Sequence, residues 1–274
     1  MKIIDTETAI IGGGASGLAA AIAASRYGCG NVTVLEKMQR VGKKILSTGN
    51  GRCNLTNRNI TLLDYTGDTE LLSYISPDID NAEDFFSSLG LICRADDNGR
   101  VYPYSNAATS VLDALRFAAD SSGIRTVCDF TVSEITKTKH GFIITDGETQ
   151  VKAKRVIIAA GGKAAPSLGS SGEGYELCRS LGHSVTRLFP ALAPVRTDIE
   201  LVKSLKGLRV AADATLISGG RVIDRQSGEV QFTDGALSGI CIFNLSAKAA
   251  EYINNGEISL DTAPTLGKDE LYGL

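Results

Sequence analysis

The stretch Ala9-Ile10-Ile11-Gly12-Gly13-Gly14-Ala15-Ser16-Gly17 decides the fold of this chain. It predicts an apolar strand that runs directly into a Gly-x-Gly-x-x-Gly turn, and the small residues from Leu18 to Tyr27 predict the helix that follows. A second short strand, Val32 to Leu35, ends at the acidic residue Glu36. Strand, turn, helix, strand and acid therefore occur in the order of a complete nucleotide-binding βαβ unit.

Each part of this unit has a physical role in holding a dinucleotide. Gly12 allows the tight turn, Gly14 lets the backbone approach a pyrophosphate, and Gly17 lets the helix pack closely on the strand. The first helical residues, Ala15 and Ser16, belong to a helix N-terminus that offers free N–H groups and a positive dipole end to phosphates. Glu36 can accept hydrogen bonds from ribose hydroxyls and would repel a 2′-phosphate. The sequence therefore predicts a dinucleotide site.

Composition predicts an enzyme of ordinary globular type. The 274 residues are 43% hydrophobic and 22% charged, with a net charge of -3, which argues against nucleic acid or an anionic membrane as a partner. Six cysteines without a C-x-x-C pair predict reduced thiols and a cytoplasmic location. We expect neither a membrane span nor a signal segment, because the apolar run at 9–24 contains the glycine motif.

The segment from Lys37 to Leu63 carries a concentrated positive charge, with six basic residues and no acid. Gly, Asn, Ser and Thr are dense in it, which predicts a loop that wraps a polar ligand with backbone and amide groups. Because the loop directly follows Glu36, we interpret its charge as an offset to a pyrophosphate; the alternative is a solvated basic loop. The candidate ligand-binding residues here are Lys37, Lys43, Lys44, Ser47, Gly49, Asn50, Gly51, Arg52, Cys53 and Asn54.

A second ligand-facing turn is predicted further along the chain. The apolar run 156–158 predicts a buried parallel strand, and it is followed by Ala160, Gly161 and Gly162, whose small size permits close backbone approach to a ligand. Between the two turns the sequence predicts a helix at 83–89, a helix with Ser105 as its N-cap, and short strands. The expected strands lie at 99–103, 124–127, 132–137, 141–145 and 150–153.

From about residue 190 the pattern becomes alternating and β-rich. It predicts strands at 211–217, 221–224, 230–232 and 240–245. The predicted fold is therefore α/β: a Rossmann-like dinucleotide-binding domain with a parallel sheet at residues 1–190, and an inserted β-rich second domain at 191–274.

Several of these stretches together resemble the bacterial FAD-dependent oxidoreductases known as BaiN-like or aminoacetone-oxidase-like flavoproteins. The most specific match is Thr48-Gly49-Asn50-Gly51-Arg52-Cys53-Asn54-Leu55-Thr56-Asn57. Further matching stretches are 12–20, 36–37, 42–47, 99–103, 160–162 and 228–233, with Gly235 and 237–239. The resemblance implies FAD as the cofactor, with Glu36 on the adenosine ribose, Val132 near the adenine and the loop from Ser47 to Asn54 near the flavin.

Two departures from this family pattern affect what is expected. Glu173 stands where the family more often has Asp. Family members are also longer, and a segment after the inserted domain returns to the nucleotide-binding sheet. We therefore expect the FAD-binding domain to lack this return and the second domain to be incomplete, which leaves the activity of these 274 residues open.

The sequence names a chemistry but no catalytic side chain. A flavin carries hydride chemistry itself, while the protein orients the reactants. We interpret His183 as a helix-end or packing residue. We interpret Cys53 as a packing residue, and a redox role is the alternative. The sequence shows no cluster of metal-ligating residues. The predicted function is hydride transfer between a small organic substrate and flavin, with NAD(P)H or oxygen as second partner. The alternatives are a nicotinamide-dependent dehydrogenase and a catalytically silent nucleotide-binding fragment. Substrate, reaction direction and oligomeric state are not predicted.

Overall fold

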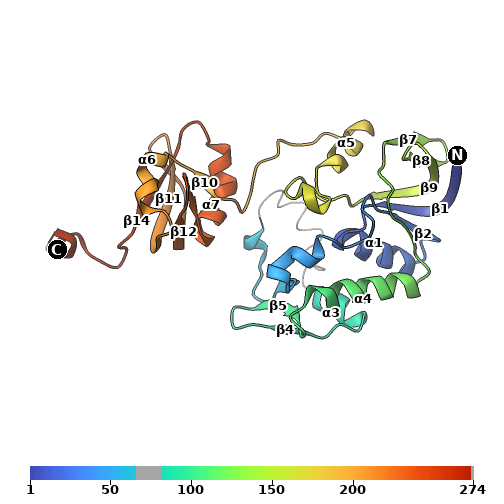
Figure 1. The fold of residues 1–274 in the computed structure, drawn as a ribbon, viewed down its shortest axis with the longest axis horizontal. Coiled ribbons are helices and arrows are strands. Elements are labelled where there is room, and N and C mark those ends of the chain that lie inside the picture. The colour runs from blue at the N-terminus through green and yellow to red at the C-terminus, as the bar shows by residue number, and fades with distance from the viewer. Residues whose placement is uncertain (66–81, 273–274) are drawn as a thin grey trace. The chain divides into compact units, whose positions relative to one another are not determined.

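A computed structural model describes residues 1–65 and 82–272 of the protein (Figure 1). The chain divides into two compact units, Met1–Val185 and Thr186–Leu274, and each is described by itself. Whether the second unit is an insertion into the first domain remains a prediction. Within the described residues, no helix combines the length and apolar character that crossing a membrane requires.

The first unit is built on a six-stranded sheet with the order β6-β2-β1-β9-β8-β7. Strands β1 (Lys2–Ile11), β2 (Val32–Leu35), β6 (Arg125–Val127) and β9 (Thr149–Ile158) are parallel, whereas β7 (Glu134–Thr138) and β8 (Gly141–Thr145) form an antiparallel extension. The predicted Rossmann-like fold with a parallel sheet is therefore confirmed. A small separate sheet pairs β3 (Thr56–Asn57), β5 (Arg100–Pro103) and β4 (Cys93–Ala95).

Both faces of the main sheet are covered, which explains the unbroken apolar run at the end of β1. Ile10 packs into a core with Leu18 of α1 (Ala15–Arg26) and Leu115 of α4 (Ala108–Ser121). Its neighbour Ile11 points to the opposite face and packs with Leu177 of α5 (Glu173–Ser180). Alternate residues of a strand point to opposite faces, so a strand buried on both sides must be apolar throughout. The short helix α3 (Ala82–Ser88) contributes partly buried phenylalanines to the first core.

Two local expectations for this unit are wrong. The strands expected at 150–153 and 156–158 are one strand, β9, because the intervening Lys154 and Arg155 keep exposed side chains while the backbone continues its pairing with β1. The N-cap of α4 is Ala107 rather than Ser105. The Ser105 hydroxyl instead accepts a hydrogen bond from the Ala107 amide at 3.3 Å.

The second unit is an antiparallel sheet with one long helix on it. The strand order is β10-β13-β12-β11-β14, and the helices are α6, α7 and α8. Their bounds are β10 (Val195–Arg196), α6 (Ile199–Val202), β11 (Arg209–Ser218), β12 (Arg221–Phe232), β13 (Ala236–Ser238), α7 (Ile240–Glu251), β14 (Gly256–Asp261) and α8 (Lys268–Tyr272).

Two expectations for this unit are also wrong. The strand expected at 240–245 is the first half of the helix α7. Cys241, Ile242 and Leu245 are buried there, and this i, i+1, i+4 spacing places them on one helical face against the sheet. The strands expected at 221–224 and 230–232 form the single long strand β12, which pairs with β11 along its length.

Candidate functional site

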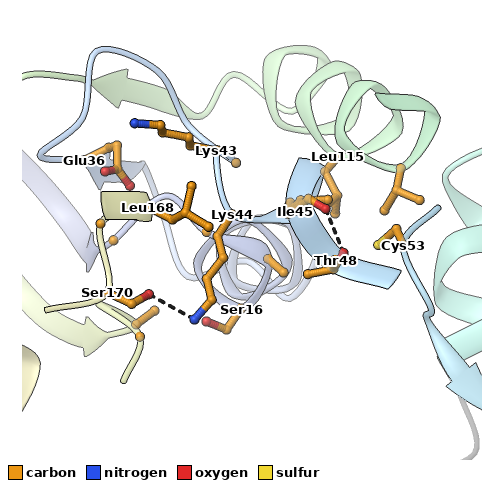
Figure 2. Close-up of a pocket in the computed structure, with 18 of the residues that line it drawn as sticks. Ser16, Glu36, Lys43, Lys44, Ile45, Thr48, Cys53, Leu115, Leu168 and Ser170 are labelled. Carbon is orange, nitrogen blue, oxygen red and sulfur yellow. Dashed lines mark hydrogen bonds between the residues drawn. The ribbon is translucent and has the colours of Figure 1, made fainter. Parts of the chain in front are cut away.

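The candidate site is a pocket of about 430 Å³ where β1, β2 and β9 end. Three segments that directly follow these strands line it, at Gly12, Glu36 and Ala159. Figure 2 shows Glu36 and Lys43 at one end of the pocket and Cys53 and Leu115 at the other. Parallel α/β sheets bind ligands in the crevice outside their carboxyl ends, so the pocket lies where the fold places a ligand.

The three fingerprint glycines have different reasons to be glycine. A Cβ atom on Gly12, whose φ is +105°, would lie 2.5 Å from the Ala159 carbonyl oxygen, and one on Gly17 would lie 1.8 Å from the Gly12 carbonyl oxygen. Gly14 instead has an ordinary extended backbone, and a Cβ there would meet no heavy atom within 4 Å. Gly12 and Gly17 are therefore required by the fold, whereas Gly14 keeps space open in front of α1.

The N-terminus of α1 meets this open space with no side-chain cap and no acidic residue in its own first turn. Gly14 is the N-cap residue, no side chain caps it, and the first turn of this helix contains no acidic residue. Gly14, Ala15 and Ser16 all line the pocket. The first amides of a helix lack partners within the helix and carry its positive dipole end, so this arrangement suits a phosphate group.

Glu36 is fixed in position beside the glycine turn. Its side chain is buried, one carboxylate oxygen accepts the Gly13 amide at 2.7 Å, and the other accepts the Met38 amide at 2.8 Å. Each carboxylate oxygen can accept a further hydrogen bond, so the group remains able to receive ribose hydroxyls. Glu36 therefore holds the turn in shape and presents an acceptor to the pocket.

A smaller cavity of about 50 Å³ adjoins the main pocket and shares Gly12, Glu36, Ala160 and Gly169 with it. Val132 and Lys37, two predicted site residues, line this cavity, together with Glu173 and apolar side chains of the second core. The structure thus brings Val132 and Glu36 to one end of the site.

The predicted lysines lie at the site, but they have partners within the protein. Lys44 donates to the Ser170 hydroxyl at 3.2 Å, as Figure 2 shows, and Lys43 donates to the Ser167 carbonyl oxygen at 3.2 Å. Lys37 donates to the Ser171 hydroxyl at 2.8 Å and forms an ion pair with Glu173 at 2.6 Å. Partial burial acts to raise the pKa of Glu173, but the hydrogen bonds from Lys37 and Ser171 outweigh it and lower the pKa from 4.5 to about 2.

Eleven of the predicted site residues line the main pocket: Gly12, Gly14, Ala15, Ser16, Glu36, Lys43, Lys44, Cys53, Asn54, Ala160 and Gly161. Seven others line neither cavity: Gly17, Ser47, Gly49, Asn50, Gly51, Arg52 and Gly162. Arg52 lies over the Tyr102 ring at 4.6 Å, and Gly49, Asn50 and Gly51 have positive φ angles that shape the loop. Of the residues from Ser47 to Asn54, therefore, only Thr48, Cys53 and Asn54 line the pocket.

Sequence reasoning missed several residues that line the pocket. The apolar ones are Ile45, Leu55, Phe86, Val111, Leu115 and Leu168, and the others include Met38, Arg40, Gly42, Gly169 and Ser170. Val111 and Leu115 belong to the apolar stripe of α4, which looks the same in sequence whether it faces a core or a cavity. Ser170 could have been predicted from the sequence, because it lies in the glycine-rich run before α5 and such runs often approach a ligand.

The chain matches the HI0933-like protein Rossmann domain family over residues 6–267, and it belongs to that family. It is 38% identical over 252 residues to the 3-dehydro-bile acid delta(4,6)-reductase of Clostridium scindens, covering 90% of this chain and 61% of that protein. It is also 25% identical over 253 residues to the ribosomal RNA dihydrouridine synthase of Haemophilus influenzae, covering 88% of this chain and 61% of that protein. The family resemblance inferred from the sequence is therefore confirmed, and the chain spans about 61% of the length of these two curated relatives.

A solved structure supports the fold assignment. The open conformation of a flavocytochrome c3 fumarate reductase matches with a TM-score of 0.56 at 18% identity. The match covers 76% of this chain and 47% of that one. At this identity the likeness establishes the shared Rossmann-like fold.

Proposed function

We propose that this protein binds FAD and acts as an FAD-dependent oxidoreductase. The observation that carries the proposal is the uncapped N-terminus of α1, which faces open space over Gly14 beside the fixed carboxylate of Glu36. Such a pair of groups suits a dinucleotide, whose pyrophosphate needs N–H donors and whose ribose needs an acceptor. Membership of the HI0933-like family and the reductase relative support the same cofactor.

Each part of the site has a role toward this cofactor. The amides at Ala15 and Ser16 would hold the pyrophosphate, Glu36 would hold the adenosine ribose, and the cavity beside Val132 would receive the adenine. Cys53 lies at the end of the pocket away from Glu36, where the flavin half would extend, and the next residue, Asn54, also lines the pocket. When bound, FAD supplies hydride chemistry, and the protein supplies position and electrostatics.

The proposed reaction is hydride transfer between flavin and a small organic substrate, with NAD(P)H or oxygen as second partner. The 38% identical relative is named as a reductase of a small molecule, whereas the relatives named as RNA enzymes are 25% and 24% identical. A net charge of -3 also disfavours a polyanionic substrate. We place the protein in the cytoplasm because each of its six cysteines is a free thiol.

The identity of the released cofactor tests this function. The purified protein is denatured, and the supernatant is examined by absorption spectroscopy and mass spectrometry. We expect FAD, either as purified or after incubation with added FAD. Release of a nicotinamide dinucleotide alone, or failure to take up FAD while the protein is folded by circular dichroism, would overturn the proposal. Retention of a ribosomal RNA fragment in preference to small molecules would instead favour an RNA substrate.

A further inference from the structure

One wall of the nucleotide pocket is a short hairpin from Ala165 to Ser170. Its two end residues exchange backbone hydrogen bonds, at 3.3 Å from the Ala165 amide and 3.0 Å from the Ser170 amide. Leu168, Gly169 and Ser170 line the main pocket. The hairpin is therefore a small unit with its own internal bonds, and one side of it faces the site.

Apolar packing contributes little to holding this hairpin in place. Residues 163–172 contribute no member to the three described hydrophobic cores, whereas Ala160 before them and Leu177 after them both do. The segment is also flanked by Gly161 and Gly172, whose φ angles of +76° and +98° are freely available to glycine. A segment with few buried apolar contacts opens at a low free-energy cost.

The side-chain hydrogen bonds that link this segment to a distant part of the chain, among the described residues, all come from the basic loop after β2. Lys43 and Lys44 donate to Ser167 and Ser170 within the hairpin. Lys37 binds Ser171 and Glu173, directly after it. Three lysines of the loop therefore all reach across to residues 167–173.

We propose that the Ala165–Ser170 hairpin is a lid over the nucleotide pocket and that Lys37, Lys43 and Lys44 form its latch. The nature of the ligand beneath the lid rests on the proposed function, but the lid itself does not. Opening the lid would set the rate at which the cofactor enters and leaves. The lysines then act as positioning residues for the hairpin, and their main effect is on rates of exchange.

The competing explanation is that the lysines attract the cofactor phosphates directly, and the two explanations predict opposite signs. A latch broken by Lys37→Met opens more often, so the association rate constant rises; loss of direct attraction lowers it. A latch broken by Glu173→Gln speeds dissociation, whereas removing a negative charge from the site would slow the dissociation of an anion. Because single exposed ion pairs are weak, we expect changes of about twofold to fivefold.

Stopped-flow measurement of flavin fluorescence on FAD binding and release gives both rate constants. The variants are Lys37→Met, Glu173→Gln and their double variant. Lys37 and Glu173 are the two partners of one ion pair in the latch, so the rate constants of the double variant should match those of the single variants rather than show an added effect. Glu176→Gln is the matched control, because Glu176 lies on the same helix and pairs with Arg179 away from the two cavities. A slower association in Lys37→Met, or a slower dissociation in Glu173→Gln, would overturn the latch.

Hydrogen exchange of the protein without added cofactor tests the lid independently of FAD. The amides of Ala165 and Ser170 should exchange faster by a similar factor in Lys37→Met and Glu173→Gln, and at the original rate in Glu176→Gln. Unchanged exchange in the two latch variants would overturn the lid even if FAD binds. Failure of the protein to bind FAD would overturn the proposed function and leave the exchange result standing.

Discussion

Substituting Gly14 by Val should severely weaken cofactor binding while leaving the protein folded. Gly14 has φ -78° and ψ -168°, a backbone conformation open to any residue, and a Cβ there would meet no protein atom within 4 Å. Loss of an N-cap glycine disfavours the helix slightly, while the reduced freedom of the unfolded chain favours folding. We therefore expect a change in unfolding free energy within about 1 kcal/mol.

The effect on binding should be much larger, because the valine side chain would occupy the space left for the pyrophosphate. A hydrogen bond to a charged group contributes about 1.5–3 kcal/mol, and a phosphate at this helix end would lose at least two of them. The loss of about 3–6 kcal/mol corresponds to a weakening of about 10²- to 10⁴-fold in the Kd for FAD. Fluorescence titration of the folded variant with FAD measures this Kd.

The same substitution at Gly17 is the matched control. A Cβ at Gly17 would lie 1.8 Å from the Gly12 carbonyl oxygen, so Gly17→Val should fail to fold or unfold at a much lower temperature. Gly14→Val then loses binding because the valine side chain occupies the space of the ligand, whereas Gly17→Val loses binding because the protein no longer folds. A folded Gly14→Val protein that binds FAD as tightly as the original chain would refute the assignment of this turn to the phosphates.

Three further outcomes can be measured. Glu36→Ala should weaken FAD binding and also lower the unfolding free energy by about 1.5–3 kcal/mol, because the Gly13 and Met38 amides lose a charged acceptor. Glu36→Gln keeps one carbonyl oxygen, so it should recover part of the FAD affinity and part of the stability. Titration with FAD and urea unfolding measure the two effects. Ile242→Ala should lower the free energy of unfolding in urea by about 2–5 kcal/mol, because Ile242 is fully buried. Ile240→Ala, at a 71% exposed position on the same helix, should change it by less than about 0.5 kcal/mol. Equal effects of the two substitutions would contradict the assignment of this segment to the helix α7. The folded-state pKa of Glu173, about 2, lies below its unfolded value, so its contribution to holding the hairpin closed is complete above about pH 5 and is lost as the pH falls toward 2. The protection of the hairpin amides, taken as their exchange rate relative to that of an unstructured peptide at the same pH, should therefore decrease over that range, and should do so less in Glu173→Gln.

The parts of the fold that the sequence predicted well are those set by local patterns. The first βαβ unit depends on glycine spacing and on a buried apolar strand, and both are visible within the first 36 residues. The helix α7 was misassigned because Ile240-Cys241-Ile242-Phe243-Asn244-Leu245 is compatible with a strand as well as a helix. What decides between them is packing: Ile242 and Leu245 both lie on the face that covers the sheet.

The candidate site was predictable where it depends on backbone and unpredictable where it depends on distant partners. Gly12, Gly14 and Glu36 line the pocket as their motif requires. The lysines were also placed at the site, but their partners lie more than 120 positions away in sequence, as in the contact between Lys44 and Ser170. No local pattern reports such a pairing, because it depends on how β9 and the following hairpin return to the end of β2.

These pairings change what the charge of the basic loop can do, and salt provides a test of this. Six cations in one loop suggest strong attraction for a phosphate, yet Lys37 pairs with Glu173, Arg58 pairs with Glu83 and Arg52 lies on an aromatic ring. Arg40, Lys43 and Lys44 line the pocket and form no ion pair within the described residues, so their charge and the N–H groups of α1 remain as the sources of attraction. If the lysines hold the lid, salt weakens the latch and raises the association and dissociation rate constants together, so that the Kd for FAD changes little. If they attract the ligand, salt slows association and speeds dissociation, and the Kd rises steeply. Stopped-flow measurements between 0.05 and 0.5 M salt, a range over which the screening length falls about threefold, separate the two. A fall in the association rate constant across that range would show that the pocket-lining cations of the loop attract the ligand directly.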